Sequence, residues 1–384
     1  MNRHQTLWMR WTLWIVLLAT AIAPAAVAAA EPESLSAEEF SRMIRDFSEE
    51  GGYFMSDNFT SSEDSYLSIT NKLQELAVKN GAYIGVGPEQ NFTYIAKVRP
   101  RIAFIVDIRR QAMIQHLMFK AIFQLSPTRA HFLSCLLSRP IPAGKDPAAS
   151  APVDEILALF ENIPADSRTY EKNLASIRKI IQEDYRFPLS QEDQESLEYV
   201  YRSFRTWGFN IGFSSSSSGR RGRGFSRDPN LREILAMRDS KGKQGSFFAS
   251  AEDYDFVRGM HRRNLIIPVV GDFAGKKALA SVGAYLHKRK LDVSVFYVSN
   301  VEMILLDWNS FEQFADFVEN VKKLPTNDRS LFLRSSFTYY GHPTGLPGRQ
   351  FCSFLQKISD YLRDFSQNRY RDYQDLIQAP YIGP

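Results

Sequence analysis

Residues 81–120, GAYIGVGPEQNFTYIAKVRPRIAFIVDIRRQAMIQHLMFK, decide the fold class of this chain. A short apolar run, 82–84, leads into Gly85-Val86-Gly87; a helix-compatible segment follows, and a second apolar run, 102–106, ends on Asp107. The acid lies 22 positions after Gly85. Strand, glycine turn, helix, strand and acid in this order are typical of a βαβ unit that binds a nucleoside or dinucleotide.

The chemistry of such a unit is specific. Glycines let the backbone approach a ligand, and a carboxylate at the end of the second strand can accept hydrogen bonds from two ribose hydroxyls. The dinucleotide pattern is incomplete, because Gln90 stands at the third glycine position and Pro88 suits a first helical turn. Two interpretations remain: a nucleoside site, or glycines that only turn the chain while Asp107 caps a helix over 109–125.

Three later apolar runs extend the pattern: 265–270, 293–298 and 330–337, which alternate with helical periods over 276–288 and 311–324. Continuous apolar strands that alternate with helices predict an α/β fold with a parallel sheet covered on both faces. Ligands of such sheets bind beyond the carboxyl ends of the strands. We therefore expect the residues at these ends to converge: Gly85, Gly87, Asp107, Asp272, Ser299 and Asn300. Pro268 is awkward for a central strand, because it cannot donate to the ladder.

With these residues the chain resembles the class I methyltransferases, which have a Rossmann-like sheet and bind S-adenosylmethionine. Gly85-Val86-Gly87 is similar to their glycine loop and Asp107 to their ribose-binding acid. Asp272, in VVGDF, is similar to the acid near the adenine. The resemblance covers about residues 80–126 and 264–340 and implies S-adenosylmethionine as the cofactor.

The same resemblance places Tyr297 and Asn300 where substrate and methyl group meet, with Glu302 as a candidate base. The chain departs from that family in its short glycine loop, in a long insertion before the third strand and in having no evident strand pair after the fifth. A closer resemblance is to an uncharacterised bacterial family with the segments GVGPEQNFTYIA…DIRR and GDFAG…YVSNVE. It implies no activity.

The rest of the chain is predicted to be helix and linker. N-terminal helices over 31–80, one opened by Ser36 and one over 63–80, precede the α/β domain, which we assign to 81–138 and 264–384. A helical insertion, 139–263, interrupts it and contains a Ser/Gly/Arg loop, 213–225, expected to be flexible. A final amphipathic helix is expected over 349–366.

The N-terminus has the three parts of a secretory signal peptide. Arg3 and Arg10 precede an apolar core, and small residues follow up to Ala30. Cleavage is expected before Ala29 or Glu31, which would place the protein in the periplasm or outside the cell. The alternative is an uncleaved anchor; no later segment is long and apolar enough to span a membrane.

Cysteine content and charge set further bounds. Cys135 and Cys352 are the two cysteines, and they are expected to form either one bridge or two buried thiols. The six histidines are scattered, so no metal site is expected. The formal net charge of +4, about +2 after signal removal, does not demand nucleic acid as a partner.

Two functions fit these observations. The first is a methyltransferase-like enzyme in which Asp107 and Asp272 hold the nucleoside. The second is a non-catalytic module that binds another ligand or a protein partner, because a fold does not determine a function. An exported location favours the second, since S-adenosylmethionine is made in the cytoplasm.

Overall fold

The computed structural model describes residues 34–76, 79–215 and 228–384. The predicted signal peptide and most of the predicted loop 213–225 lie outside these ranges. Within them the fold is a mixed α/β fold around one six-stranded sheet, in the order β3-β2-β1-β4-β5-β6. The strands are β1 (Ala82–Gly85), β2 (Ile102–Asp107), β3 (Ile266–Val270), β4 (Val293–Ser299), β5 (Leu331–Phe337) and β6 (Phe351–Lys357). The first five are parallel, and β6 pairs antiparallel with β5.

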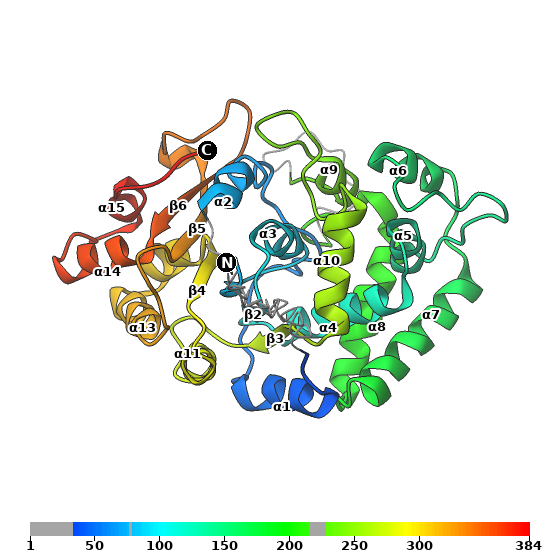
Figure 1. Ribbon diagram of the computed structural model, residues 1–384, viewed down its shortest axis with the longest axis horizontal. Helices are drawn as coiled ribbons and strands as arrows, with labels where there is room; N and C mark the ends of the chain where they lie inside the picture. The colour runs from blue at the N-terminus through cyan, green and yellow to red at the C-terminus, as the bar shows by residue number, and fades with distance from the viewer. Residues whose placement is uncertain (1–33, 77–78, 216–227) are drawn as a thin grey trace, which may run out of the picture. The chain divides into compact units, whose positions relative to one another are not determined.

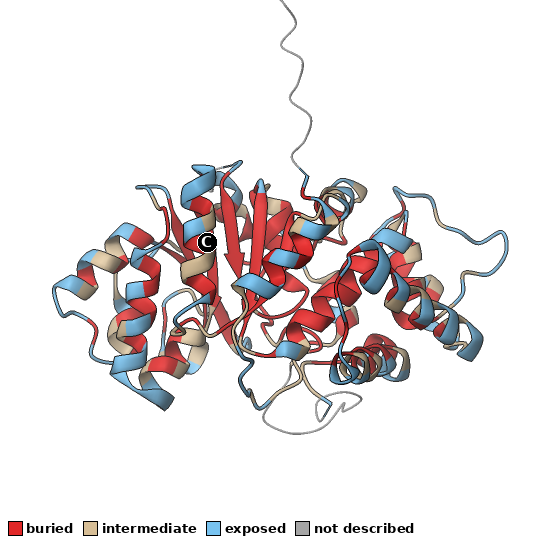
Figure 2. Ribbon diagram, turned by 90° about the horizontal axis from the view of Figure 1, so that it is seen from below, coloured by how far each residue is buried: buried red, intermediate tan, exposed pale blue. Residues whose placement is uncertain are grey.

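The five strands predicted from apolar runs are confirmed. Their runs are continuous because helices cover both faces, so that every residue of β1, β2 and β3 is buried (Figure 2). One face carries α3 (Gln90–Val98), α4 (Arg110–Leu125) and α10 (Ala251–Arg262); the other carries α1 (Ala37–Phe47), α11 (Ala278–Arg289), α13 (Phe311–Lys322) and α14 (Ile358–Ser366) (Figure 1).

Pro268 lies in β3, where it is opposite Ile105 of β2. Because β3 is at the edge of the sheet, it pairs with β2 alone. A proline is tolerated there when its missing N–H would have faced away from the ladder. Pro268 was expected to be unfavourable in a central strand, and the strand order resolves this because β3 is an edge strand.

The segment between β2 and β3 is helical, and its helices begin before the predicted insertion 139–263. It contains α5 (Arg129–Leu137), α6 (Val153–Glu161), α7 (Ser167–Lys179) with the π-helical turn η1 (Ile180–Asp184), α8 (Gln191–Trp207), η2 (Gly208–Asn210) and α9 (Leu231–Ala236). Phe119 of α4 packs edge-to-face on Phe204 of α8, and Phe123 contacts Phe132 of α5. The insertion therefore shares one core with the sheet-covering helices.

Two predicted helices are wrong in part. Residues 64–69 form turns, and among the described residues of the range expected to be a helix, 63–80, helix is confined to α2 (Thr70–Leu76). The predicted final helix begins as β6, and α14 follows it. Phe351, Phe354 and Ile358 have helical spacing, but antiparallel pairing with the whole of β5 outweighs that local pattern. The remaining elements are α12 (Val301–Met303), η3 (Ile304–Asn309), η4 (Thr338–Tyr340) and α15 (Tyr373–Gln378).

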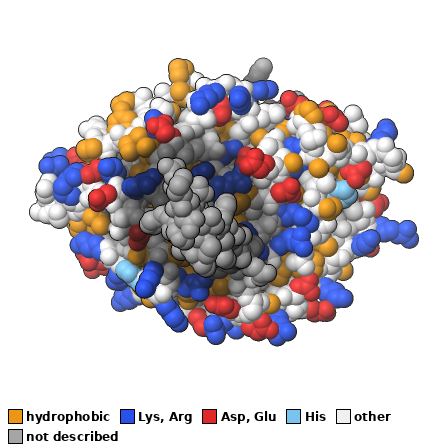
Figure 3. Space-filling view, viewed as in Figure 1, with side chains coloured by type: hydrophobic (Ala, Val, Ile, Leu, Met, Phe, Trp, Pro, Cys, Tyr) orange, Lys and Arg blue, Asp and Glu red, His pale blue; other side chains and the backbone are white. Residues whose placement is uncertain are grey.

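Cys135 and Cys352 are free and buried, so of the two alternatives the pair of buried thiols is confirmed. Among the helices of the described ranges, none combines the length and apolar character needed to span a membrane. On the face shown in Figure 3, Lys and Arg side chains lie among Asp and Glu side chains.

Candidate functional site

A cavity of about 810 Å³ lies beyond the carboxyl ends of the parallel strands. Each of the five strands contributes to its wall through the residues at its end: 86–88 after β1, 107–109 at β2, 271–273 after β3, 299–301 at β4 and 337–339 at β5. The strand order reverses between β1 and β4. Ligands of open α/β sheets bind at this point of reversal, and the predicted convergence of strand ends is observed.

The two glycines of the loop after β1 have different roles. Gly87 has φ +79° and lines the cavity, and a Cβ built there meets no atom within 4 Å. Gly85 is not part of the cavity wall; a Cβ there would lie 2.0 Å from Oδ1 of Asn91. Gly85 therefore makes room for Asn91, and Gly87 provides the left-handed turn and the open approach.

Asn91 and His116 hold the loop in place. The Asn91 amide donates to the carbonyl oxygens of Val86, Gly87 and Pro88 at 2.8, 3.1 and 2.8 Å. Nε2 of His116 lies 2.9 Å from the Gly87 carbonyl oxygen, and since a carbonyl only accepts, Nε2 carries the proton. Burial lowers the pKa of His116 to about 4, so this ring is neutral at ordinary pH.

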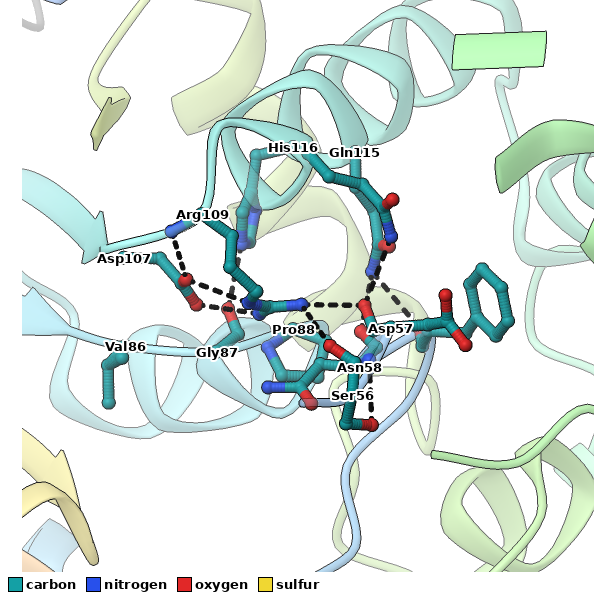
Figure 4. A network of polar contacts seen from close by, with 12 residues as sticks. Ser56, Asp57, Asn58, Val86, Gly87, Pro88, Asp107, Arg109, Gln115 and His116 are labelled. Carbon is teal, nitrogen blue, oxygen red and sulfur yellow. Dashed lines mark hydrogen bonds and ion pairs between the residues drawn. The ribbon is translucent and has the colours of Figure 1, made fainter. Parts of the chain in front are cut away.

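Asp107, the predicted ribose-binding acid, lines the cavity but already has a cationic partner. Its two carboxylate oxygens accept from Nε and Nη2 of Arg109 at 3.0 and 2.8 Å, and Oδ1 also accepts from the Arg109 backbone N–H at 3.0 Å (Figure 4). Both residues are buried. The alternative role as a helix cap is not observed in its usual form, because the bond goes to Arg109, the residue before α4.

Arg109 also reaches a distant segment. Its Nη1 donates to the carbonyl oxygens of Ser56 and Asp57 at 3.3 and 2.6 Å (Figure 4). Gln115 of α4 adds bonds to the carbonyl oxygens of Asn58 and Phe59 at 3.2 and 3.0 Å. The end of β2 and the start of α4 therefore fix the segment 56–59 against the cavity, which residues 53–55 and 58 line.

Glu63 is a buried carboxyl group of the wall and is 3% exposed. Oε1 accepts from the Tyr297 hydroxyl at 2.5 Å and from the Ser299 hydroxyl at 2.7 Å, and Oε2 accepts from the Gln90 amide at 2.7 Å. Burial raises the pKa of Glu63, and hydrogen bonds with Tyr297, Ser299, Gln90 and Ser335 oppose that rise only in part. Gln90 is in turn held by the Ser61 hydroxyl.

The mouth of the cavity carries large apolar side chains that are exposed. Tyr53, Met55, Trp308 and Tyr339 line the cavity and are 87%, 70%, 56% and 73% exposed. They come from the segment before α2, from η3 and from η4. Single exposed apolar residues are ordinary, but several around one opening are typical of a binding site.

Some of the other predicted site residues line the cavity, and one does not. Asp272 and Asn300 line the cavity, and Tyr297 lines it while donating to Glu63. Glu302 does not belong to the wall; it is 1% exposed and forms an ion pair with Arg334 of β5. Because its carboxylate is engaged in this buried ion pair and does not line the cavity, Glu302 is not a candidate base for a ligand bound there. Within the described ranges, no three or more His, Cys, Asp and Glu side chains are grouped so as to hold a metal ion.

The family model described as Domain of unknown function (DUF7790) matches residues 59–139 and 155–381, most of the chain. The chain belongs to this family. The matched ranges include Glu63, the glycine loop, Asp107, Asp272 and Tyr297. A comparison with curated proteins found no similar sequence.

The sequence prediction missed the part of this DUF7790 site that precedes β1. Glu63 and the mouth residues 53–55 lie in turns and loops, where hydrophobic periodicity gives no signal. Arg109 was also missed as a partner of Asp107. A signal for that pair exists, since residues two apart at the end of a strand lie on the same side of the chain.

Proposed function

We propose that the cavity at the carboxyl ends of the strands binds a small organic molecule, and that this binding is the function of the site. The observation that carries the proposal is the volume of about 810 Å³ gathered at the ends of all five parallel strands. Sites for small molecules have volumes of roughly 300–1,000 Å³ and combine apolar walls with a few fixed polar groups.

The wall has that composition. Apolar side chains dominate its sides, among them Phe54, Phe213, Phe273, Ile304, Leu305 and Phe351. Two carboxylates among its polar groups are held in place, Glu63 by hydrogen bonds from Tyr297, Ser299 and Gln90 and Asp107 by Arg109. A ligand with an apolar ring or chain at the mouth and a polar group at the deep end fits this arrangement.

A panel of small molecules tests the proposal by thermal unfolding and calorimetry. A ligand at about 100 times its Kd adds about 2.7 kcal/mol to the free energy of unfolding, which raises the melting temperature by several degrees. The matched control is Leu305→Trp, which reduces the cavity from within. A true ligand loses affinity for this variant, whereas a molecule that binds elsewhere does not. If no class of small molecule raises the melting temperature, the proposal fails.

A second candidate is the methyltransferase-like enzyme, with S-adenosylmethionine as cofactor. It is supported by the strand order β3-β2-β1-β4-β5, which is that of Rossmann-like sheets, and by the presence of Gly87, Asp107, Asp272 and Asn300 in one wall. Against it stands Arg109, because a ribose diol would have to share or displace this partner of Asp107.

Calorimetry with S-adenosylmethionine, S-adenosylhomocysteine, adenosine and 2′,3′-dideoxyadenosine separates the candidates. If Asp107 holds the diol, the dideoxy compound binds about ten- to a hundredfold more weakly than adenosine, because a charge-assisted hydrogen bond contributes about 1.5–3 kcal/mol. Equal binding of the two nucleosides rules out this role for Asp107. If none of the four compounds binds, S-adenosylmethionine is ruled out as the cofactor.

A further inference from the structure

Glu63 stands out among the acids of the cavity wall. Asp107 is neutralised by Arg109, Asp228 is only partly buried, and Asp272 is also partly buried and accepts from the Ala274 N–H at 2.9 Å. Glu63 is buried, lines the cavity and receives hydrogen bonds from neutral groups. No ion pair joins it to a cation in the described part of the chain.

The tyrosines and the cysteine that interact with Glu63 stay neutral near pH 7. The titratable side chains that interact with it are Tyr66, Tyr83 of β1, Tyr94 of α3, Tyr297 of β4 and Cys352 of β6. Burial raises the pKa of each of them, so none is charged there. The other nearby acid is Glu89, which accepts from the Ser61 N–H at 3.2 Å and whose pKa is raised by burial to about 7.

The two carboxylate oxygens of Glu63 differ in how fully they are used. Oε1 accepts from two hydroxyl groups and Oε2 from one amide, and the Ser335 hydroxyl of β5 is a further hydrogen-bonding neighbour that favours the carboxylate. The Gln90 amide nitrogen also lies 2.6 Å from the Tyr297 hydroxyl, and donation to this oxygen orients its proton toward Glu63.

We propose that Glu63 is the proton-exchanging group of the cavity, and that the bound molecule presents an O–H or N–H group to its carboxyl group. This inference rests on the proposed binding function and adds the chemistry of the ligand. The ionised carboxylate takes the proton of that group, and the bonding electron pair stays on the ligand's oxygen or nitrogen. The protonated carboxyl returns the proton in the reverse step. Raised carboxyl pKa values in clefts are typical of groups with this role.

Dicyclohexylcarbodiimide, an apolar reagent for protonated carboxyl groups, is the probe. The carboxyl proton moves to one carbodiimide nitrogen, the carboxyl oxygen bonds to the central carbon, and the adduct rearranges to a stable N-acylurea. The full chain is treated at a series of values from about pH 5 to pH 9, which spans ordinary and raised Glu pKa values. Labelled residues are then located by peptide mass spectrometry.

Glu63 is expected to react, and its labelling is expected to persist well above the pH at which Glu75 stops reacting, since the Glu75 side chain is 64% exposed. Glu89 is the matched control, because it is a buried carboxyl with a raised pKa but does not line the cavity. It is expected to stay unlabelled. Tyr297→Phe removes a hydrogen bond that stabilises the carboxylate, so the labelling midpoint of Glu63 rises.

Dicyclohexylurea, the unreactive analogue, separates failure of this inference from failure of the proposed function. If the urea raises the melting temperature but Glu63 is not labelled, or is labelled with the pH profile of Glu75, the cavity binds and the role of Glu63 is overturned. If the urea neither raises the melting temperature nor reduces carbodiimide labelling, and Glu63 is not labelled, both proposals are overturned. Equal labelling of Glu63 and Glu89 also refutes the inference. Since these readouts use the wild-type chain, they do not depend on a variant folding.

Discussion

Glu89 offers a quantitative test of how burial sets the charge state beside the cavity. It is 4% exposed at the start of α3, and its Oε2 has no hydrogen-bond partner in the described part of the chain. Burial raises its pKa from the usual 4.5 to about 7, and the bond from the Ser61 N–H offsets part of that rise. The perturbation is Glu89→Gln, which has a similar shape and never ionises.

The sign follows from proton binding. Between pH 4.5 and about pH 7 the folded protein keeps a proton on Glu89 that the unfolded chain releases. Stability contributed by this group is therefore fully present below pH 4.5 and is lost as the pH rises through about 7. One pKa unit corresponds to about 1.4 kcal/mol, so the free energy of unfolding falls by an amount on the order of 3 kcal/mol. The Glu89→Gln variant does not show this loss, because glutamine does not ionise.

The assay is urea unfolding of wild type and variant at several pH values from about 4.5 to 8.5. The difference in free energy of unfolding between variant and wild type should move by about 3 kcal/mol in favour of Glu89→Gln over this range. Other buried groups with shifted pKa values, such as His116 and Lys120, are present in both proteins and cancel in the difference. Glu75→Gln, at an exposed side chain, should show no such change. A difference that stays flat within about 1 kcal/mol would refute the reasoning.

Three further predictions use other parts of the molecule. Arg109→Met should lower the free energy of unfolding by about 3–5 kcal/mol, because it leaves the buried Asp107 carboxylate unpaired; a loss below about 1 kcal/mol in urea unfolding contradicts this. Gly87→Ala should cost about 1–2 kcal/mol from its φ of +79° alone, since no atom opposes the added Cβ; thermal unfolding measures this, and an unchanged melting temperature would count against it. Protein from the native host should begin at Ala29 or Glu31 on N-terminal sequencing, and an intact Met1 would show that the chain is not processed.

Most of the sheet could be predicted because its strands are buried on both faces. Runs such as IAFIVD and LIIPVV have no polar residue in their interior, so they do not fit the pattern of an amphipathic helix. Once the strands alternate with helices, the convergence of Gly87, Asp107, Asp272 and Asn300 follows from parallel topology alone. β6 could not be found in this way, because its apolar residues also fit a helical period.

Glu63 could not be predicted for a different reason. Its role depends on Tyr297, 234 positions away, and on Gln90, 27 positions away. Nothing in the sequence around Glu63 distinguishes it from a residue at the start of an exposed helix. Only the fold shows that its carboxyl is desolvated and faces a cavity, and this desolvation is what gives it a shifted pKa.

The Asp107–Arg109 pair connects the two halves of the site. Arg109 satisfies the acid at the end of β2 and, through Nη1, holds the carbonyl oxygens of Ser56 and Asp57. The mouth residues Tyr53 and Met55 immediately precede that anchored segment. A ligand that competes for Asp107 would therefore weaken the anchor of the wall that encloses it, whereas a ligand that binds at Glu63 leaves the anchor intact. For this reason the geometry favours a ligand that binds at the Glu63 end of the cavity over one that forms hydrogen bonds with Asp107.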